Sequence, residues 1–136
     1  MQRHSSQNQT KDHLCVITLK RTPDRLHNFF QLNSQALEQW NVSVLEGIDG
    51  DQQKELFKRS RLISRNVLDS WSSGAIGSAL SHMRCWRLCT QLNEPIIIVE
   101  DDTILSKTLK ENLEILQKTK GELPPFLLMG WNLDSL

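Results

Sequence analysis

The sequence has no excess of charge of either sign. Its 136 residues include 16 Lys and Arg and 16 Asp and Glu, so the formal net charge is zero. A general binder of nucleic acids or anionic membranes needs a net positive surface. We therefore expect no nucleic-acid partner, although a small anionic substrate would need only a few local cations.

Cysteine is scarce. The three residues Cys15, Cys85 and Cys89 are an odd number without the spacing of a disulfide framework, which excludes a disulfide-stapled fold and favours a reducing compartment. Cys85 and Cys89 lie one helical turn apart. We interpret them as small core residues rather than as a metal or redox pair.

Long apolar runs are also absent. No run approaches the ~20 residues that span a bilayer, so no transmembrane segment is expected. Residues 1–13, MQRHSSQNQTKDH, lack the apolar core of a signal peptide and are predicted to be a disordered leader. We expect a cytoplasmic location, with peripheral attachment at the inner face of the membrane left open.

Short apolar segments alternate with longer amphipathic ones. Hydrophobic residues make up 38% and charged residues 24%, a composition typical of globular domains. Four strands are predicted at 14–19, 42–45, 96–99 and 126–131. Helices are predicted at 23–40, 51–59, 76–93 and 106–119, and a long polar loop at 60–73. This alternation predicts an α/β domain over 14–136, with a mainly parallel sheet of about four strands covered by helices.

Three consecutive carboxylates, Glu100, Asp101 and Asp102, directly follow the most apolar predicted strand. Ligands of parallel α/β sheets bind outside the carboxyl ends of the strands. Three adjacent anions repel one another, and a divalent cation held through oxygen is the simplest compensation. Strand alternation predicts Asp101 on one side and its two neighbours on the other. A solvated acidic turn remains the alternative.

Two further groups accompany the carboxylates. Gly74 and Gly77 begin a helix that continues into Ser81 and His82, where a backbone can approach a ligand closely and free N–H groups favour an anion. Helix entry, close packing and a hydrogen-bonded histidine are the alternatives. Lys20, Arg21 and Arg25 follow the first strand and either face a diphosphate or form a solvated helix start.

The segments ITLKRTPDRL, GAIGSALSHMRCW and IIIVEDDTIL resemble, in order and spacing, the signature segments of glycosyltransferase family 25. This family includes bacterial lipopolysaccharide galactosyltransferases and collagen galactosyltransferases. The resemblance covers about residues 14–131. It implies a Rossmann-like fold of the GT-A type, a UDP-sugar donor such as UDP-galactose, and manganese.

The resemblance also assigns residues to roles. Asp101 and Asp102 with Glu100 match the family's Asp-x-Asp-like element, which implies a metal site at Asp101 and Asp102 and catalytic carboxylates at Glu100 and Asp101. The donor-binding positions that it implies are Lys20, Arg21, Arg25, Gly77, Ser81 and His82. The sequence departs from the family at Ala75, where Glu is usual, and at Ser78, where Cys is usual.

The function expected from the resemblance is transfer of a hexose, galactose in particular, from a UDP-sugar to a glycan, lipopolysaccharide or lipid-linked acceptor. Family members are commonly about twice as long, so we expect a domain that is incomplete at its C-terminus. The alternative is a truncated, non-catalytic module that binds a nucleotide or a partner. A receiver-like or phosphatase-like domain would need a phosphoryl-accepting aspartate with a later lysine, which the sequence does not offer.

Overall fold

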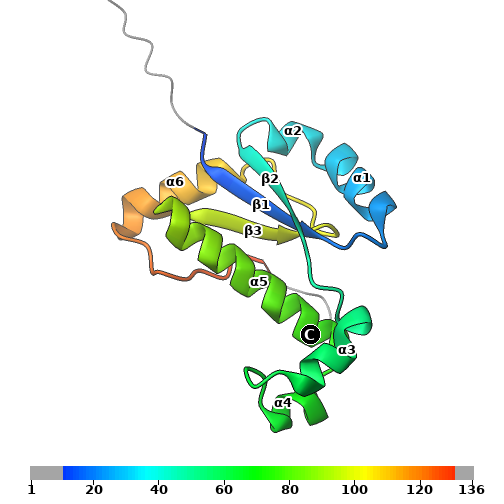
Figure 1. The fold of residues 1–136 in the computed structure, drawn as a ribbon. Helices are drawn as coiled ribbons and strands as arrows, with labels where there is room; N and C mark the ends of the chain where they lie inside the picture. The colour runs from blue at the N-terminus through cyan, green and yellow to red at the C-terminus, as the bar shows by residue number, and fades with distance from the viewer. Residues whose placement is uncertain (1–10, 131–136) are drawn as a thin grey trace, which may run out of the picture. The chain divides into compact units, whose positions relative to one another are not determined.

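The computed structural model describes residues 11–130 and is shown in Figure 1. It forms two compact units, one up to Ile104 and one from Leu105 onward, and we describe each by itself. The prediction for the leader falls mostly on residues 1–10, which lie outside the described residues. The first strand takes in His13, so it begins one residue before the predicted start.

A parallel sheet forms the centre of the first unit. Its strands are β1 (His13–Thr18), β2 (Asn41–Glu46) and β3 (Ile96–Glu100). They lie in the order β2-β1-β3, and β1 pairs in parallel with both neighbours. Leu14, Cys15 and Val16 are fully buried, because β1 is covered on both edges and both faces.

The prediction of about four strands is wrong for the described part of the chain, where the sheet has three. The apolar segment that was predicted as the fourth strand follows Pro124 and Pro125 and forms no strand up to Gly130. Its side chains are not covered, since Phe126 is 66% exposed and Leu128 is 80% exposed. Apolar composition alone did not distinguish a buried strand from an uncovered apolar segment.

The first predicted helix is interrupted. The structure has α1 (Pro23–Leu32) and α2 (Ser34–Leu37) in place of one helix over 23–40. Asn33 lies at the break and is buried, with its Nδ2 donating to the carbonyl oxygens of Phe29 at 2.9 Å and Thr103 at 3.0 Å. A buried amide needs such partners, and this Asn finds one of them outside its own helix.

Three helices follow β2, and each has a side-chain N-cap. They are α3 (Gly50–Arg59), α4 (Arg65–Ser70) and α5 (Ser73–Leu92), capped by Asp49, Ser64 and Ser72. The predicted loop over 60–73 therefore contains a short helix, which its lack of apolar periodicity concealed. Such capping satisfies N–H groups that a helix start leaves unpaired.

Helices cover both faces of the sheet, with α1 and α2 on one side and α5 on the other (Figure 1). Cys15 and Ile17 of β1 form a buried cluster with Cys85 of α5. The Sγ atoms of the two cysteines are 3.7 Å apart, and the Cys15 neighbour together with burial raises the pKa of Cys85. Cys85 is thus a core residue as predicted, whereas Cys89 is half-buried.

The second unit contains α6 (Leu109–Lys120), which begins three residues later than predicted from sequence. Gly121 ends this helix at a φ of +75°, a conformation that glycine adopts without strain. Among the helices of residues 11–130, none is long and apolar enough to cross a membrane.

Candidate functional site

The carboxyl ends of the neighbouring strands β1 and β3 lie side by side at one edge of the sheet. The chain leaves β1 toward β2 on one side, and β3 lies on the other side of β1, so the strand order reverses between β1 and β3. Ligands of open α/β sheets bind at such a point. The backbone stays tightly paired here, because Asp101 N donates to Ile17 O at 3.1 Å.

Arg25, which follows β1, contacts the two aspartates that follow β3. Its Nη2 lies 2.6 Å from Asp101 Oδ1 and 2.9 Å from Asp102 Oδ2. The other oxygen of Asp101 accepts a hydrogen bond of 2.7 Å from Thr18 Oγ1. The Asp101 side chain is only 4% exposed, so these contacts compensate an almost fully buried carboxylate.

Glu100 points to the opposite face of the sheet, toward α5. Its Oε1 accepts a 2.9 Å hydrogen bond from Ser78 Oγ and lies 3.2 Å from His82 Nε2. Both side chains of this contact are partly exposed, His82 at 33% and Glu100 at 43%. An imidazole held by a carboxylate in a partly open position is an arrangement used to move protons.

The predicted alternation of the three carboxylates is half right. Glu100 and Asp101 do point to opposite faces, because Glu100 is the last residue of β3. Asp102 was predicted on the side of Glu100 but contacts Arg25 together with Asp101. The chain turns after Glu100, so the two-residue period of a strand no longer applies.

Gly77 and Ser81 hold the loop after β2 against α5. Ser81 Oγ accepts a 2.7 Å hydrogen bond from Ile48 N and donates one of 2.7 Å to Gly77 O. A Cβ on Gly77 would lie 2.4 Å from Ile48 O, so only glycine permits this contact. Of the alternatives for Gly77, the structure shows close packing between a helix and a loop.

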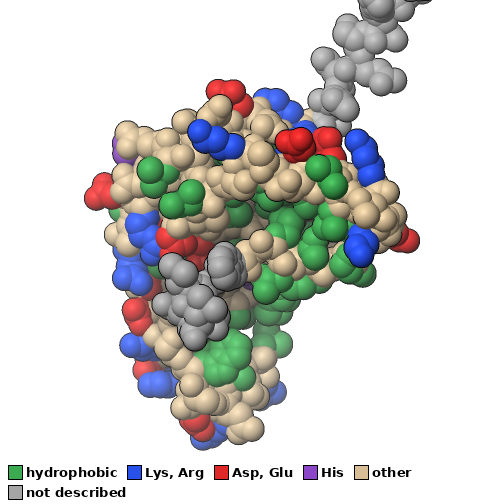
Figure 2. Space-filling view, turned by 180° about the vertical axis from the view of Figure 1, so that it is seen from behind, with side chains coloured by type: hydrophobic (Ala, Val, Ile, Leu, Met, Phe, Trp, Pro, Cys, Tyr) green, Lys and Arg blue, Asp and Glu red, His purple; other side chains and the backbone are tan. Residues whose placement is uncertain are grey.

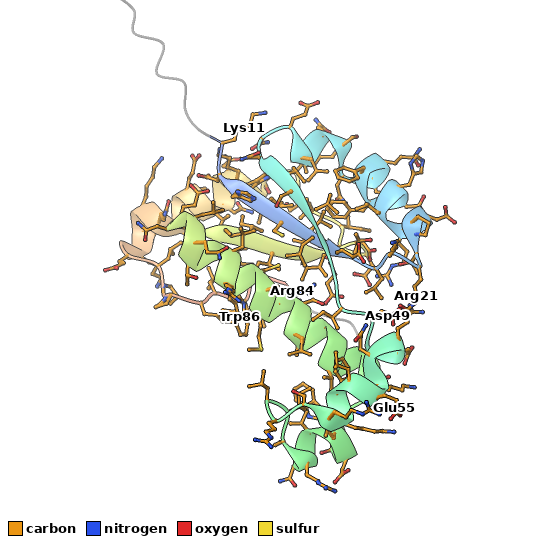
Figure 3. The ribbon with its side chains drawn as sticks, viewed as in Figure 1. Lys11, Arg21, Asp49, Glu55, Arg84 and Trp86 are labelled. Carbon is orange, nitrogen blue, oxygen red and sulfur yellow. The ribbon has the colours of Figure 1, made fainter. Side chains whose placement is uncertain are left out.

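A cavity of about 520 Å³ opens beside this loop. Its charged lining residues are Lys20, Arg21, Glu46, Asp49 and Arg84, and the amides of Gln52 and Gln53 join them. Arg21 Nε contacts Asp49 Oδ2 at 2.7 Å, and the two side chains lie together next to α3 (Figure 3). The cavity thus combines cations with donors and acceptors of hydrogen bonds.

Asp51, at the start of α3, continues this polar network. Its Oδ1 accepts a 2.5 Å hydrogen bond from Ser73 Oγ, and its Oδ2 lies 3.8 Å from Arg21 Nη2. The hydroxyl of Ser73, followed by the ammonium of Lys54, holds the pKa of Asp51 below its ordinary value. The network links the first loop to the N-terminal ends of α3 and α5.

The sequence matches the model of glycosyltransferase family 25, described as an LPS biosynthesis protein, over residues 11–134. The chain belongs to glycosyltransferase family 25. A search of the curated proteins and a search of the solved structures each found no match. The resemblance inferred from three sequence segments is therefore confirmed over almost the whole chain.

The predicted positions of this family 25 domain fall into four groups in the structure. Arg25, Asp101 and Asp102 form one cluster, and Lys20 and Arg21 line the cavity. His82 instead contacts Glu100 on the α5 side, and Gly77 and Ser81 support the loop after β2.

Sequence reasoning missed Asp49 and Arg84. Asp49 lies in a Gly- and Asp-rich turn after β2, and a position after a parallel strand was the available signal. Arg84 carried no such signal, because its Nη1 reaches the carbonyl oxygen of Glu46, 38 residues away in sequence, at 3.3 Å. Only the tertiary structure places Asp49 and Arg84 at the same cavity.

The carboxylates of the family 25 domain can be tested for their fit to the implied metal. Asp101 Oδ1 and Asp102 Oδ2 converge on one point, which the Nη2 of Arg25 occupies. Among the described residues, no group of three His, Cys, Asp or Glu could hold a metal ion. Ions of the Mg²⁺ or Mn²⁺ type take only one or two protein carboxylates, so the two oxygens would suffice in number, and Arg25 supplies the compensating cation here.

Proposed function

We propose that this protein transfers a hexose, galactose in the first instance, from a UDP-sugar to a saccharide or lipid-linked acceptor in the cytoplasm. Membership of family 25 supports the glycosyl transfer. The UDP-sugar donor is proposed from the cluster of Arg25, Asp101 and Asp102, which lies where the strand order reverses. Arg25 is close in sequence to Lys20 and Arg21, the cations that line the cavity. Carboxylates and cations at this place suit a diphosphate and its counter-ion.

The donor's diphosphate would lie over the carboxyl ends of β1 and β3. Lys20 and Arg21 line the neighbouring cavity and would contact phosphate oxygens, where negative charge grows as the sugar leaves. Gln52, Gln53 and Asp49 line the same cavity and offer hydrogen bonds to a nucleoside. Asp49 lies in the loop after β2, which the Gly77 and Ser81 contacts hold against α5, and Gln52 and Gln53 follow it in α3.

Mn²⁺ would be held by Asp101 and Asp102. When bound, it supplies neutralisation of the charge on the leaving diphosphate. Arg25 is charged and occupies the same point, so it would turn from the carboxylates toward a phosphate oxygen when the ion binds. Its guanidinium suits both positions, because it pairs equally with carboxylate and phosphate.

The acceptor hydroxyl must lose a proton, and we assign the base to His82 with Glu100. Asp101 is nearly fully buried, with Arg25 and Thr18 on its two oxygens, so we place this carboxylate at the metal rather than at the acceptor hydroxyl. If Nε2 of His82 donates its hydrogen to Glu100, Nδ1 carries the lone pair that takes the proton. The acceptor oxygen then bonds to the anomeric carbon while the sugar–phosphate bond breaks and its electron pair leaves with UDP.

Calorimetry with UDP tests the donor site. Wild-type protein is expected to bind UDP more tightly with Mn²⁺ than without it. Asp102→Asn removes one convergent oxygen and should abolish that difference, whereas Asp69→Asn, in α4, should keep it. Equal UDP affinity of the wild type with and without Mn²⁺ would contradict the proposed metal site.

Release of UDP from UDP-galactose tests the base. Loss of a general base slows proton transfer by about 10²–10⁴-fold, so His82→Gln should lower UDP release by this order while UDP affinity is kept. Ser78→Ala is the matched control, because Ser78 shares Glu100 Oε1 but offers no lone pair of comparable basicity. Tight UDP binding without UDP release by the wild type would favour the non-catalytic module.

A further inference from the structure

A segment after the cavity departs from the charge balance of the chain. Residues 54–71 hold five Lys and Arg against two Asp and Glu, and the stretch KRSRLISR over 58–65 holds four basic residues and no acidic one. It comprises most of α3, the loop after it, α4 and Trp71. We name residues 54–71 the α3–α4 lobe.

Three arginines of the lobe form no ion pair with any described residue. In the described part of the chain, Lys54 pairs with Asp51 and Lys58 with Glu55, whereas Arg59, Arg61 and Arg65 form no ion pair. All three arginines are exposed. Their positive charge is therefore available to a partner.

The most exposed large hydrophobic side chain of the first unit lies among these arginines. Leu62 is 95% exposed and Ile63 beside it is half-buried, and both line the cavity. The backbone is fixed on both sides of this pair, since Ser60 Oγ accepts from Leu62 N and Ser64 Oγ caps α4. Leu62 thus projects outward from an ordered turn.

Two more exposed apolar side chains belong to the lobe, Leu56 at 63% and Trp71 at 52%. Figure 2 shows a hydrophobic patch on the lower part of the molecule, where α3 and α4 lie, with basic and acidic side chains toward its edges. Single exposed apolar residues are common on protein surfaces. Here they occur together with three arginines that form no ion pair, and this combination indicates a binding surface.

We propose that the α3–α4 lobe docks onto a membrane surface that carries anionic lipids. The arginines would contact the headgroups, while Leu62 and Trp71 enter the boundary with the acyl chains, as the apolar and basic residues of interfacial segments do. A nucleic acid would satisfy the arginines and leave Leu62 in water. A protein partner would need acidic groups placed around an apolar pocket to match both features, whereas an anionic bilayer offers headgroups above acyl chains everywhere on its surface, so the combination favours lipid.

The zero net charge of the chain does not oppose this proposal. Screening confines electrostatic attraction to about 8 Å at physiological ionic strength, so a membrane responds to the local charge of the lobe rather than to the total. The proposal goes beyond the transfer reaction and does not depend on it. Since Leu56 and Leu62 also line the cavity, docking would bring the cavity next to the bilayer.

Co-sedimentation of the full chain with lipid vesicles tests the proposal. Wild-type protein should sediment with vesicles of phosphatidylglycerol and phosphatidylcholine, and stay in solution with phosphatidylcholine alone. At about 1 M salt, where the Debye length is only about 3 Å, binding should weaken strongly. No sedimentation with the anionic vesicles, or equal sedimentation with both kinds, would overturn the docking surface.

A matched pair of triple variants locates the basic part of the surface. Arg59→Gln/Arg61→Gln/Arg65→Gln should lower the partition coefficient about 100-fold, at about fivefold for each basic residue. Lys107→Gln/Lys118→Gln/Lys120→Gln removes the same charge from exposed positions of the second unit and should change it little. An equal loss in both triple variants would show an effect of net charge and contradict the assignment.

Leu62→Ser tests the apolar contact. Loss of its burial in the interface should weaken binding about tenfold. Leu32→Ser, at a position of α1 that is 70% exposed, is the control and should bind like the wild type. Both substitutions lie in exposed positions, so thermal unfolding should be unchanged. Unaltered binding of Leu62→Ser would remove this residue from the interface.

Discussion

At the residue scale, Arg25 contributes more to the stability of the fold than its exposed position implies. Its side chain is 44% exposed, yet it contacts two carboxylates, of which Asp101 is nearly fully buried. A buried charge that loses its partner is costly, whereas an exposed ion pair contributes little. Arg25 therefore stabilises the fold chiefly through Asp101 and only weakly through Asp102.

Arg25→Gln is accordingly expected to lower the free energy of unfolding by about 1.5–3 kcal/mol, the range for a hydrogen bond to a charged group. Urea unfolding at neutral pH measures this. Asp102→Asn is the control, because the Asp102 side chain is 65% exposed, and it should cost less than about 1 kcal/mol. Equal losses in the two variants would contradict the dominant role of Asp101.

The contact between Ser73 and Asp51 has a pH signature. The hydrogen bond from Ser73 lowers the pKa of Asp51 in the folded protein, so its stabilising effect is present above the ordinary value of 3.8 and is lost as the pH falls through the lowered value. Ser73→Ala should raise this pKa. Carbon-13 NMR titration of the Asp51 carboxyl measures it, and an unchanged titration would show that Ser73 is not responsible.

At the scale of elements, most helices and strands could be predicted from sequence. The three sheet strands, α3, α5 and α6 follow from apolar runs, helical periodicity and turn residues. The break at Asn33 and the short α4 could not be predicted, because one depends on a contact with Thr103 and the other has no apolar stripe. For the site, strand ends located Asp101 and Arg25, whereas the contacts of His82 and Arg84 exist only in the folded chain.

Packing between α5 and the loop after β2 leads to a prediction for two glycines of one helix. Gly77→Ala places a Cβ 2.4 Å from Ile48 O, and such overpacking should lower the free energy of unfolding by about 1–3 kcal/mol. Gly74→Ala meets its nearest atom at 4.0 Å, so the better helix propensity of alanine should stabilise by about 0.5–1 kcal/mol. Thermal unfolding compares the two. Changes of the same sign would refute the packing argument.

At the scale of the whole molecule, β1 is the centre of the first unit. It is paired on both edges, and its apolar side chains supply much of the buried core. In contrast, β2 pairs only with β1 among the described residues, and Val44 is 49% exposed. The most deeply paired elements of a domain open only with global unfolding.

Native-state hydrogen exchange should therefore show the slowest amides in β1. Amides of β2 that point away from β1 should exchange much faster, through local fluctuations that leave the rest folded. The measurement compares exchange free energies along both strands under conditions where closing is faster than exchange. Equal protection of β1 and of the outward amides of β2 would contradict this hierarchy.

The side chain of Asn33 has a mechanical consequence for the cluster of Arg25, Asp101 and Asp102. Through Phe29 O and Thr103 O it fastens the segment that follows Asp101 and Asp102 to the same helix that presents Arg25. The helix that presents Arg25 and the segment after its carboxylates are thus tied together by one side chain, while Asp101 itself is held to the sheet by its backbone bond to Ile17 O. If Arg25 moves to a donor phosphate as proposed, rotation about its own side-chain bonds would suffice, because these contacts hold the backbone on both sides of it.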